Sequence, residues 1–150
     1  MDRANCGYLK AGGRVLVLAA LFFFSLPLLS APKVILNDDA EITRLDSAYL
    51  SQIFAMQIRK WPNGLAIQVF TLPSDNELHR EFVVNRLHIQ AHQLDRIWNR
   101  MLFTGTGKAP AVVKSQAEMV EMIQSTPGAI GYTSADYPTG NIVTLGDKEQ

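Results

Sequence analysis

The chain has 150 residues, with equal numbers of basic and acidic side chains and a formal net charge of 0 at pH 7. Residues 1–31 hold three bases and one acid, so residues 32–150 carry a net charge near −2. This balance excludes the strongly basic face of a nucleic-acid binder. Cys6 is the one cysteine, so residues 32–150 can form neither disulfides nor thiolate metal sites. Their length, about 120 residues, suits a single domain.

The first 31 residues have the pattern of a secretory signal peptide. Three bases precede an uncharged apolar run from Val15 to Leu29, and small residues follow at Ser30 and Ala31. The run is shorter than the about 20 apolar residues of a transmembrane helix, and Pro27 would break a helix near its end. We predict a signal peptide at 1–31 and one domain at 32–150. An uncleaved N-terminal anchor or a buried core helix is the alternative.

Apolar periodicity and turn residues then predict strands that alternate with helices. Strands are predicted at 33–37, 66–71, 111–113, 129–133 and 141–145. Helices are predicted at 48–54, at 74–86, around 94–102 and at 115–125. Asp46 or Ser47 can cap the first helix, and Ser74 and Ser115 each precede a Glu by three residues, as in a capping box. This alternation predicts an α/β domain with a mixed or parallel sheet.

Large apolar side chains mark the expected core. Five residues follow the i, i+3, i+4, i+7, i+8 spacing of a packed helix: Leu94, Ile97, Trp98, Met101 and Leu102. Trp98 and Phe103 are expected to be core anchors because of their size. Gly128 is expected to end a helix, and Gly131 to let a strand approach a neighbour closely.

The sequence gives little support for catalysis, metals or cofactors. His88 and His92 are four residues apart, but no Glu or third His completes a zinc pattern, so solvated histidines are the better interpretation. No G-x-S-x-G motif is present. Asp38 and Asp39 fit a solvated polar loop, and the residues from Gly105 to Lys108 fit a helix-ending turn better than a phosphate loop. We therefore expect no enzyme, no metal and no cofactor.

One candidate binding site lies at the start of the helix predicted from Ser74. Unpaired N–H groups and the positive end of the helix dipole bind anions, and the candidate ligand-binding residues are Ser74, Asp75 and Asn76. The alternative is simple helix capping. Asp75 and Glu77 already place negative charge in this turn, which satisfies the dipole and repels a second anion.

Three segments in order resemble the phosphate-type periplasmic substrate-binding proteins of ABC transporters, and above all their short single-lobe relatives. Residues 50–64 are similar to a helix and turn that end in Ile-Phe-x-Gly-x-x-x-x-Trp, with Met56 in place of the glycine. Residues 94–110 are similar to the central stretch of the short relatives, and residues 126–132 match a Pro-Gly-Ala-Ile-Gly-Tyr segment. The resemblance implies one lobe of a type II periplasmic-binding-protein-like fold, a mixed sheet flanked by helices, and a periplasmic location.

The departures from the family bear on function. Full-length members carry Arg-x-x-Ser-Gly-Thr where this chain has Thr71, Ser74, Asp75 and Asn76, so the arginine that would pair with an oxyanion is missing. Only one of two lobes is present. The resemblance implies an exported protein that binds phosphate or another small anion, with an ABC transporter or envelope protein as partner and a homodimer as one way to rebuild a cleft. The alternative is an interaction module that has lost its ligand and docks to an envelope partner.

Overall fold

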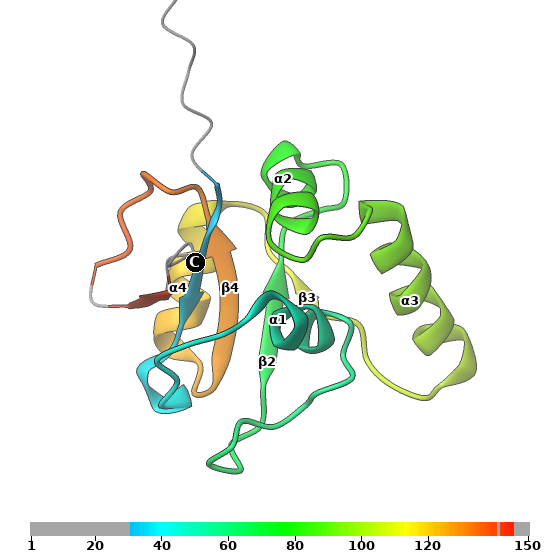
Figure 1. The fold of residues 1–150 in the computed structure, drawn as a ribbon, viewed down its shortest axis with the longest axis horizontal. Coiled ribbons are helices and arrows are strands. Elements are labelled where there is room, and N and C mark those ends of the chain that lie inside the picture. The colour runs from blue at the N-terminus through cyan, green and yellow to red at the C-terminus, as the bar shows by residue number, and fades with distance from the viewer. Residues whose placement is uncertain (1–30, 141, 146–150) are drawn as a thin grey trace, which may run out of the picture.

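The computed structural model describes residues 31–140 and 142–145, which form a five-stranded sheet covered by helices (Figure 1). The signal peptide predicted at 1–31 lies, except for Ala31, outside the described residues. Among the described residues, no helix has the length and apolar character needed to cross a membrane.

The sheet is mixed, with the strand order β3-β2-β4-β1-β5. The strands are β1 (Lys33–Leu36), β2 (Gln68–Thr71), β3 (Ala111–Val112), β4 (Ala129–Thr133) and β5 (Val143–Leu145). β2 runs parallel to both β3 and β4, whereas β1 is antiparallel to β4 and β5. This topology confirms the predicted α/β fold with a mixed sheet flanked by helices.

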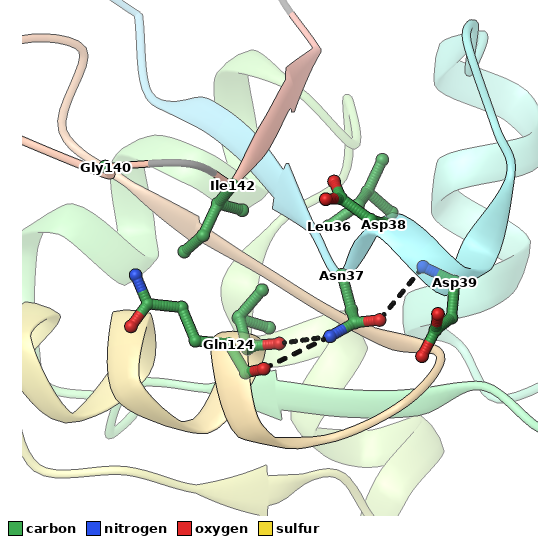
Figure 2. A pocket seen from close by; sticks show the side chains of 8 residues that line it. Leu36, Asn37, Asp38, Asp39, Gln124, Gly140 and Ile142 are labelled. Atoms are coloured by element: carbon green, nitrogen blue, oxygen red, sulfur yellow. Dashed lines mark hydrogen bonds between the residues drawn. The ribbon is translucent and has the colours of Figure 1, made fainter.

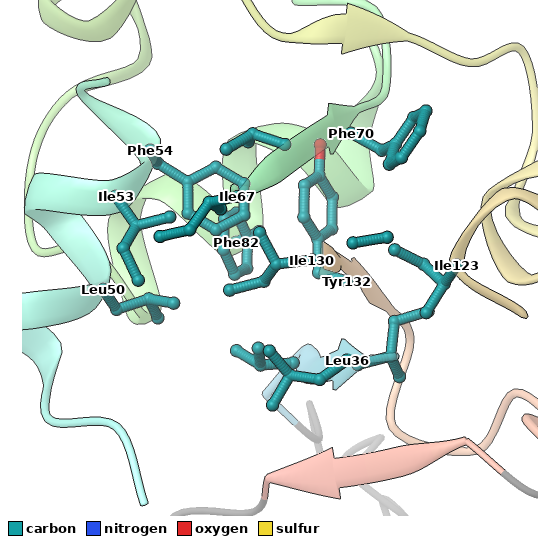
Figure 3. Close-up of a cluster of buried hydrophobic side chains, with 14 of the residues drawn as sticks. Leu36, Leu50, Ile53, Phe54, Ile67, Phe70, Phe82, Ile123, Ile130 and Tyr132 are labelled. Atoms are coloured by element: carbon teal, nitrogen blue, oxygen red, sulfur yellow. The ribbon is translucent and has the colours of Figure 1, made fainter. Parts of the chain in front are cut away.

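The helices are α1 (Ser47–Phe54), α2 (Glu77–Asn85), α3 (Ala91–Thr104) and α4 (Gln116–Ser125), with a short 3-10 helix, η1 (Asp38–Ala40). They cover both faces of the sheet. Side chains from α1 and α4 approach it from opposite sides in Figure 3, with Phe54 on one side and Ile123 on the other. Tyr132 of β4 points to the α1 face, where its ring stacks on Phe82 of α2 at a centroid distance of 3.9 Å.

Gly131 explains how α4 comes so close to the sheet. A Cβ atom at Gly131 would overlap the sulfur of Met119 and lie 3.3 Å from Cδ1 of Ile123, both on α4. Since only glycine lacks Cβ, the helix can pack directly on the strand here. The expected close approach is confirmed, and α4 is the neighbour.

The backbone geometry at the end of α1 explains why the resembling family has a glycine where this chain has Met56. The Met56 N–H donates to the carbonyl of Ile53 at 2.9 Å, and the Gln57 N–H donates to that of Gln52 at 2.9 Å. This pattern closes a helix with one residue in the left-handed conformation, usually glycine. Met56 has φ 59°, so it occupies a conformation that an L-residue adopts at a cost.

Of the α3 residues predicted in the core, Trp98 lies there, whereas Leu102 and Phe103 do not. Trp98 is buried, and its indole N–H donates to the carbonyl of Phe54 at 2.8 Å, so it anchors α3 to α1 as expected. Phe103 is 90% exposed and Leu102 is 56% exposed, so both expectations were wrong. The buried side of α3 is narrower than the predicted stripe, because its last turn extends beyond the elements on which Leu94 and Trp98 pack.

Candidate functional site

A cleft of about 300 Å³ lies where β2 ends, between the start of α2, the side of α3 and the edge strand β3. Its lining residues are Thr71, Leu72, Ser74, Asp95, Trp98, Asn99, Leu102, Ala109, Pro110 and Val112. Ligands of α/β sheets bind outside the carboxyl ends of the parallel strands, and β2 and β3 both end here. The cleft also contains Ser74, the predicted serine of the anion site.

Ser74 does not cap α2. The helix begins at Glu77, and Asn76 is its N-cap, with the side-chain oxygen accepting from the His79 N–H at 3.4 Å. The capping box predicted at Ser74 was therefore wrong. The reason is a turn before the helix, in which the Asn76 N–H donates to the carbonyl of Pro73 at 2.9 Å. The helix therefore begins after Asn76, which is itself a favourable capping residue.

The Ser74 hydroxyl instead donates a hydrogen bond to Oδ1 of Asp95 on α3, at 2.8 Å. The bond joins the loop before α2 to α3 across the cleft. It also places a carboxylate beside the hydroxyl that was predicted to meet an anion. Asp75 and Glu77 lie in the same turn and are exposed, so negative charge surrounds this position. Like charges repel, so this arrangement opposes anion binding at Ser74.

The three predicted site residues are not all brought into the cleft. Ser74 lines it, whereas Asp75 and Asn76 do not. Asp75 is exposed, and the side-chain oxygen of Asn76 is committed to the His79 N–H.

Beneath the cleft floor lies a buried polar network that joins β2, β4 and α2. The Tyr132 hydroxyl accepts from the Leu72 N–H at 2.9 Å, and lies 2.7 Å from Nδ1 of His79 and 3.0 Å from Oγ1 of Thr71. The Thr71 hydroxyl donates to the carbonyl of Leu72 at 3.1 Å. These bonds fix the position of Leu72, and therefore the backbone from which the Ser74 loop departs. Nε2 of His79 is buried and has no partner among the described residues.

Both titratable members of this network are held in their neutral forms. Burial lowers the pKa of His79 below its ordinary value, and the negative charge of Asp95 opposes this shift only in part. Burial raises the pKa of Tyr132 to about 12, against the hydrogen bonds from Thr71 and Leu72. The network is therefore uncharged at neutral pH and supports the cleft as a structural element.

Sequence reasoning missed this network. His79 stands three and four residues before Phe82 and Val83, on the same side of α2, and all three side chains are buried. That spacing is a signal for a buried histidine. Its partners Thr71 and Tyr132 lie on two other elements, and no local pattern connects them to His79.

A second and larger cleft, of about 570 Å³, lies at the opposite end of the sheet, where β1 ends (Figure 2). Its lining residues are Leu36, Asn37, Asp38, Asp39, Ile123, Gln124, Gly140 and Ile142. Asn37 is already committed, since its amide donates to the carbonyl of Ile123 at 3.0 Å and its oxygen accepts from the Asp39 N–H at 3.0 Å. None of the described residues that line this cleft is basic, so none of them would supply a positive side chain to an anion.

The other candidates lie where solvation or a turn explains them. Asp38, Asp39, His88 and His92 are all exposed. Gly105 ends α3 with φ 65°, as the predicted helix-ending turn requires. The part of the chain that the structure describes holds no group of three or more His, Cys, Asp or Glu side chains able to hold a metal ion.

Comparisons with known proteins agree with the fold. The model of the PBP superfamily domain matches residues 29–147. The structure of PstS from Borrelia burgdorferi is similar with a TM-score of 0.51 and 20% identity, over 69% of this chain and 40% of that one. An ABC-type phosphate transport receptor from Vibrio cholerae is similar with a TM-score of 0.54 and 15% identity, over 77% of this chain and 45% of that one. Among curated proteins, none matches this chain.

The chain thus spans less than half the length of either receptor. Its three motifs, its mixed sheet and the family match across most of its length agree with one another. The chain belongs to the PBP superfamily, and its fold is that of the phosphate-type receptors.

Proposed function

We propose that this chain is a non-catalytic binding module of the periplasm, which works by docking to an envelope partner through the cleft at the end of β2. The observation that carries this proposal is the bond from the Ser74 hydroxyl to the Asp95 carboxylate, at 2.8 Å. It gives the hydroxyl a partner on the chain itself and places a carboxylate beside Ser74, while the position of the arginine in the phosphate-type motif is taken by the neutral Thr71.

The cleft has the chemistry of a small contact surface. Within the cleft, Leu102 and Val112 expose apolar surface, and Asp95 and Asn99 supply polar groups. An apolar part beside a few polar groups is typical of protein interfaces. Export through the sequence at 1–31 would deliver the module to the compartment where envelope partners are found.

A second candidate function is capture of phosphate or another small anion at Ser74, Asp75 and Asn76. It is supported by the similar structures, whose names include a PstS and a phosphate transport receptor. The start of α2 also lies beside the cleft, with its positive dipole end. A homodimer would be one way to supply the second wall of a closed site.

Site-directed photocrosslinking in living cells tests the docking proposal. A photoreactive residue in place of Asn99 would report on the cleft at the end of β2, and one in place of Gln124 on the cleft at the end of β1; both native side chains are exposed. We expect a defined crosslinked partner with the residue at 99 and none with the residue at 124. Equal crosslinking from both positions, or none from either, would contradict docking through this cleft.

Isothermal titration separates the second candidate from the first. Phosphate, sulfate and small carboxylates would each be titrated into the wild type, Ser74→Ala and Asp95→Asn proteins. Docking without anion capture predicts no saturable heat for the wild type at millimolar ligand. Saturable binding that is lost in Ser74→Ala and strengthened in Asp95→Asn would instead establish anion capture, because removing the carboxylate removes the repulsion.

A further inference from the structure

Exposed apolar side chains gather at the C-terminal end of α3 and the neighbouring edge strand. Phe103 is 90% exposed, Val112 is 63% exposed and Leu102 is 56% exposed. Among the described residues, only one other large apolar side chain, Val84, is comparably exposed, at 44%. Phe103 does not line the cleft, and at 90% exposure its ring is left uncovered by the part of the chain that the structure describes.

The same end of α3 is basic. Residues 96–114 include Arg96, Arg100, Lys108 and Lys114, and they contain no acidic residue. Arg96 and Arg100 precede Phe103 by seven and three residues, which places all three on one side of the helix.

A further base joins this end from another part of the chain. The Arg59 guanidinium donates to the carbonyl of Thr106 at 3.2 Å, in the turn after α3. The ion pair found among the described residues joins Arg80 to Glu77 on α2, so it neutralises none of these bases. We call Arg96, Arg100, Phe103 and Lys108 the α3-end face, which lies beside the cleft lined by Leu102 and Val112.

Charge and shape together indicate what this face meets. A second copy of the chain, placed face to face by two-fold symmetry, would bring bases against bases. An anionic surface would be attracted instead, although residues 32–150 as a whole are slightly acidic. In Figure 1 α3 and the loop after it form one outer end of the molecule, far from β5, and Phe103 belongs to the last turn of α3.

We propose that the α3-end face lies against a membrane surface that contains anionic lipid. The Phe103 ring enters the interfacial region, and the surrounding bases lie at the level of the lipid phosphates. Protruding aromatic and aliphatic side chains flanked by Lys and Arg are the combination by which interfacial segments bind such surfaces. This proposal goes beyond docking through the cleft and does not depend on it, since Phe103, Arg96 and Arg100 do not line the cleft.

Co-sedimentation with lipid vesicles tests the proposal. The chain in its exported form, purified from the periplasm of an expression host, is mixed with vesicles of phosphatidylcholine alone or of phosphatidylcholine with phosphatidylglycerol. We expect binding to the vesicles that contain phosphatidylglycerol, weakened by high salt. Phe103→Ser should weaken binding about tenfold, because the lost apolar burial is that of one aromatic ring. Arg96→Gln with Arg100→Gln should weaken it roughly 25-fold, at about fivefold for each base.

Matched substitutions elsewhere on the surface serve as controls. Val84→Ser removes the other exposed apolar side chain, and Arg44→Gln removes an exposed base before α1. Both should bind like the wild type, and because every variant has the same N-terminus, the differences report the α3-end face alone. No binding to the anionic vesicles, or equal binding by Phe103→Ser, overturns the proposal. A protein crosslinked through Phe103 without any vesicle binding also overturns it, in favour of an acidic protein partner.

Discussion

The indole N–H of Trp61 donates a hydrogen bond to the carbonyl oxygen of Gly128, at 3.0 Å, and so joins two of the segments that carry the family resemblance. The same carbonyl accepts from the N–H of Gln68, at the start of β2, at 3.2 Å. Gly128 has φ 70°, and a Cβ atom there would overlap the carbonyl oxygen of Ala66. Both the conformation and the space therefore require glycine at this position.

Gly128→Ala is expected to lower the free energy of unfolding by roughly 2–4 kcal/mol, since it adds a backbone overlap to the cost of a left-handed residue. Gly64→Ala is the matched control, because Gly64 also has positive φ, 88°, but has open space around it. We expect the control to lose only about 1 kcal/mol. Urea denaturation measures the free energy of unfolding of both variants. Equal losses would show that the overlap with the Ala66 carbonyl oxygen adds nothing to the cost of Gly128→Ala.

Met56→Gly is expected to stabilise the chain, because it relieves the left-handed conformation at the end of α1. The relief is worth about 1–2 kcal/mol, and loss of a half-buried side chain offsets part of it, so a net gain below about 1 kcal/mol is expected. Ala55→Gly, one residue earlier at φ −74°, is the control and should destabilise slightly. A lower urea midpoint for Met56→Gly than for the wild type would contradict this account.

Much of the fold could be predicted from the sequence, because local patterns determine it. The strand at 129–133 was predicted with the observed bounds, and the helix predicted at 48–54 begins one residue earlier and buries the expected side chains Leu50, Ile53 and Phe54. Apolar periodicity, capping residues and turn glycines are all written within a few residues of one another. These signals can therefore be recognised in the sequence without knowledge of the contacts between distant residues.

The candidate site could not be predicted in the same way, because distant residues decide it. Ser74 was expected to cap α2, but Asp95, 21 residues away, takes its hydroxyl, and Asn76 caps the helix instead. Phe103 was expected in the core from its size, yet no element among the described residues covers it at the end of α3. Local sequence gives the capping and burial preferences of these residues, but not which neighbours the fold brings to them.

Tyr132→Phe is expected to lower the free energy of unfolding by about 1–3 kcal/mol. The substitution removes the hydroxyl that accepts from the buried Leu72 N–H, and it leaves His79 Nδ1 with Thr71 alone. Tyr137→Phe provides the control, because Tyr137 lies in a partly exposed loop, and it should change stability by less than about 0.5 kcal/mol. If both variants have the same urea midpoint, the hydroxyl of Tyr132 does not support the network.

The stability of the chain should fall as pH falls below 6.5, the ordinary pKa of histidine, because of His79. Its pKa in the folded chain is lowered, so the unfolded chain takes up a proton first and is favoured. The loss begins near pH 6.5 and ends below the folded-state pKa. His79→Leu should flatten the dependence of the urea midpoint on pH in this range, and an unchanged slope would assign the effect to other groups.

At the alkaline end Tyr132 should have the corresponding effect. Its pKa rises from 10.0 to about 12 on folding, so the unfolded chain loses its proton first and stability falls as pH rises from 10 towards 12. The loss is on the order of 2–3 kcal/mol, at about 1.4 kcal/mol for each pH unit. Thermal melts of the wild type and Tyr132→Phe between these pH values measure it. A parallel decline in both would contradict the assignment to Tyr132.

The most direct test of the account is a phosphate titration followed by two-dimensional ¹H–¹⁵N NMR. The amides of Ser74, Asp75, Asn76 and Glu77 report on the predicted anion site, with Asp95 beside it. Because the Asp95 carboxylate already holds the Ser74 hydroxyl, we expect these four resonances to stay in place up to millimolar phosphate. Saturable shifts concentrated on these amides would contradict the account and establish the chain as an anion-binding protein.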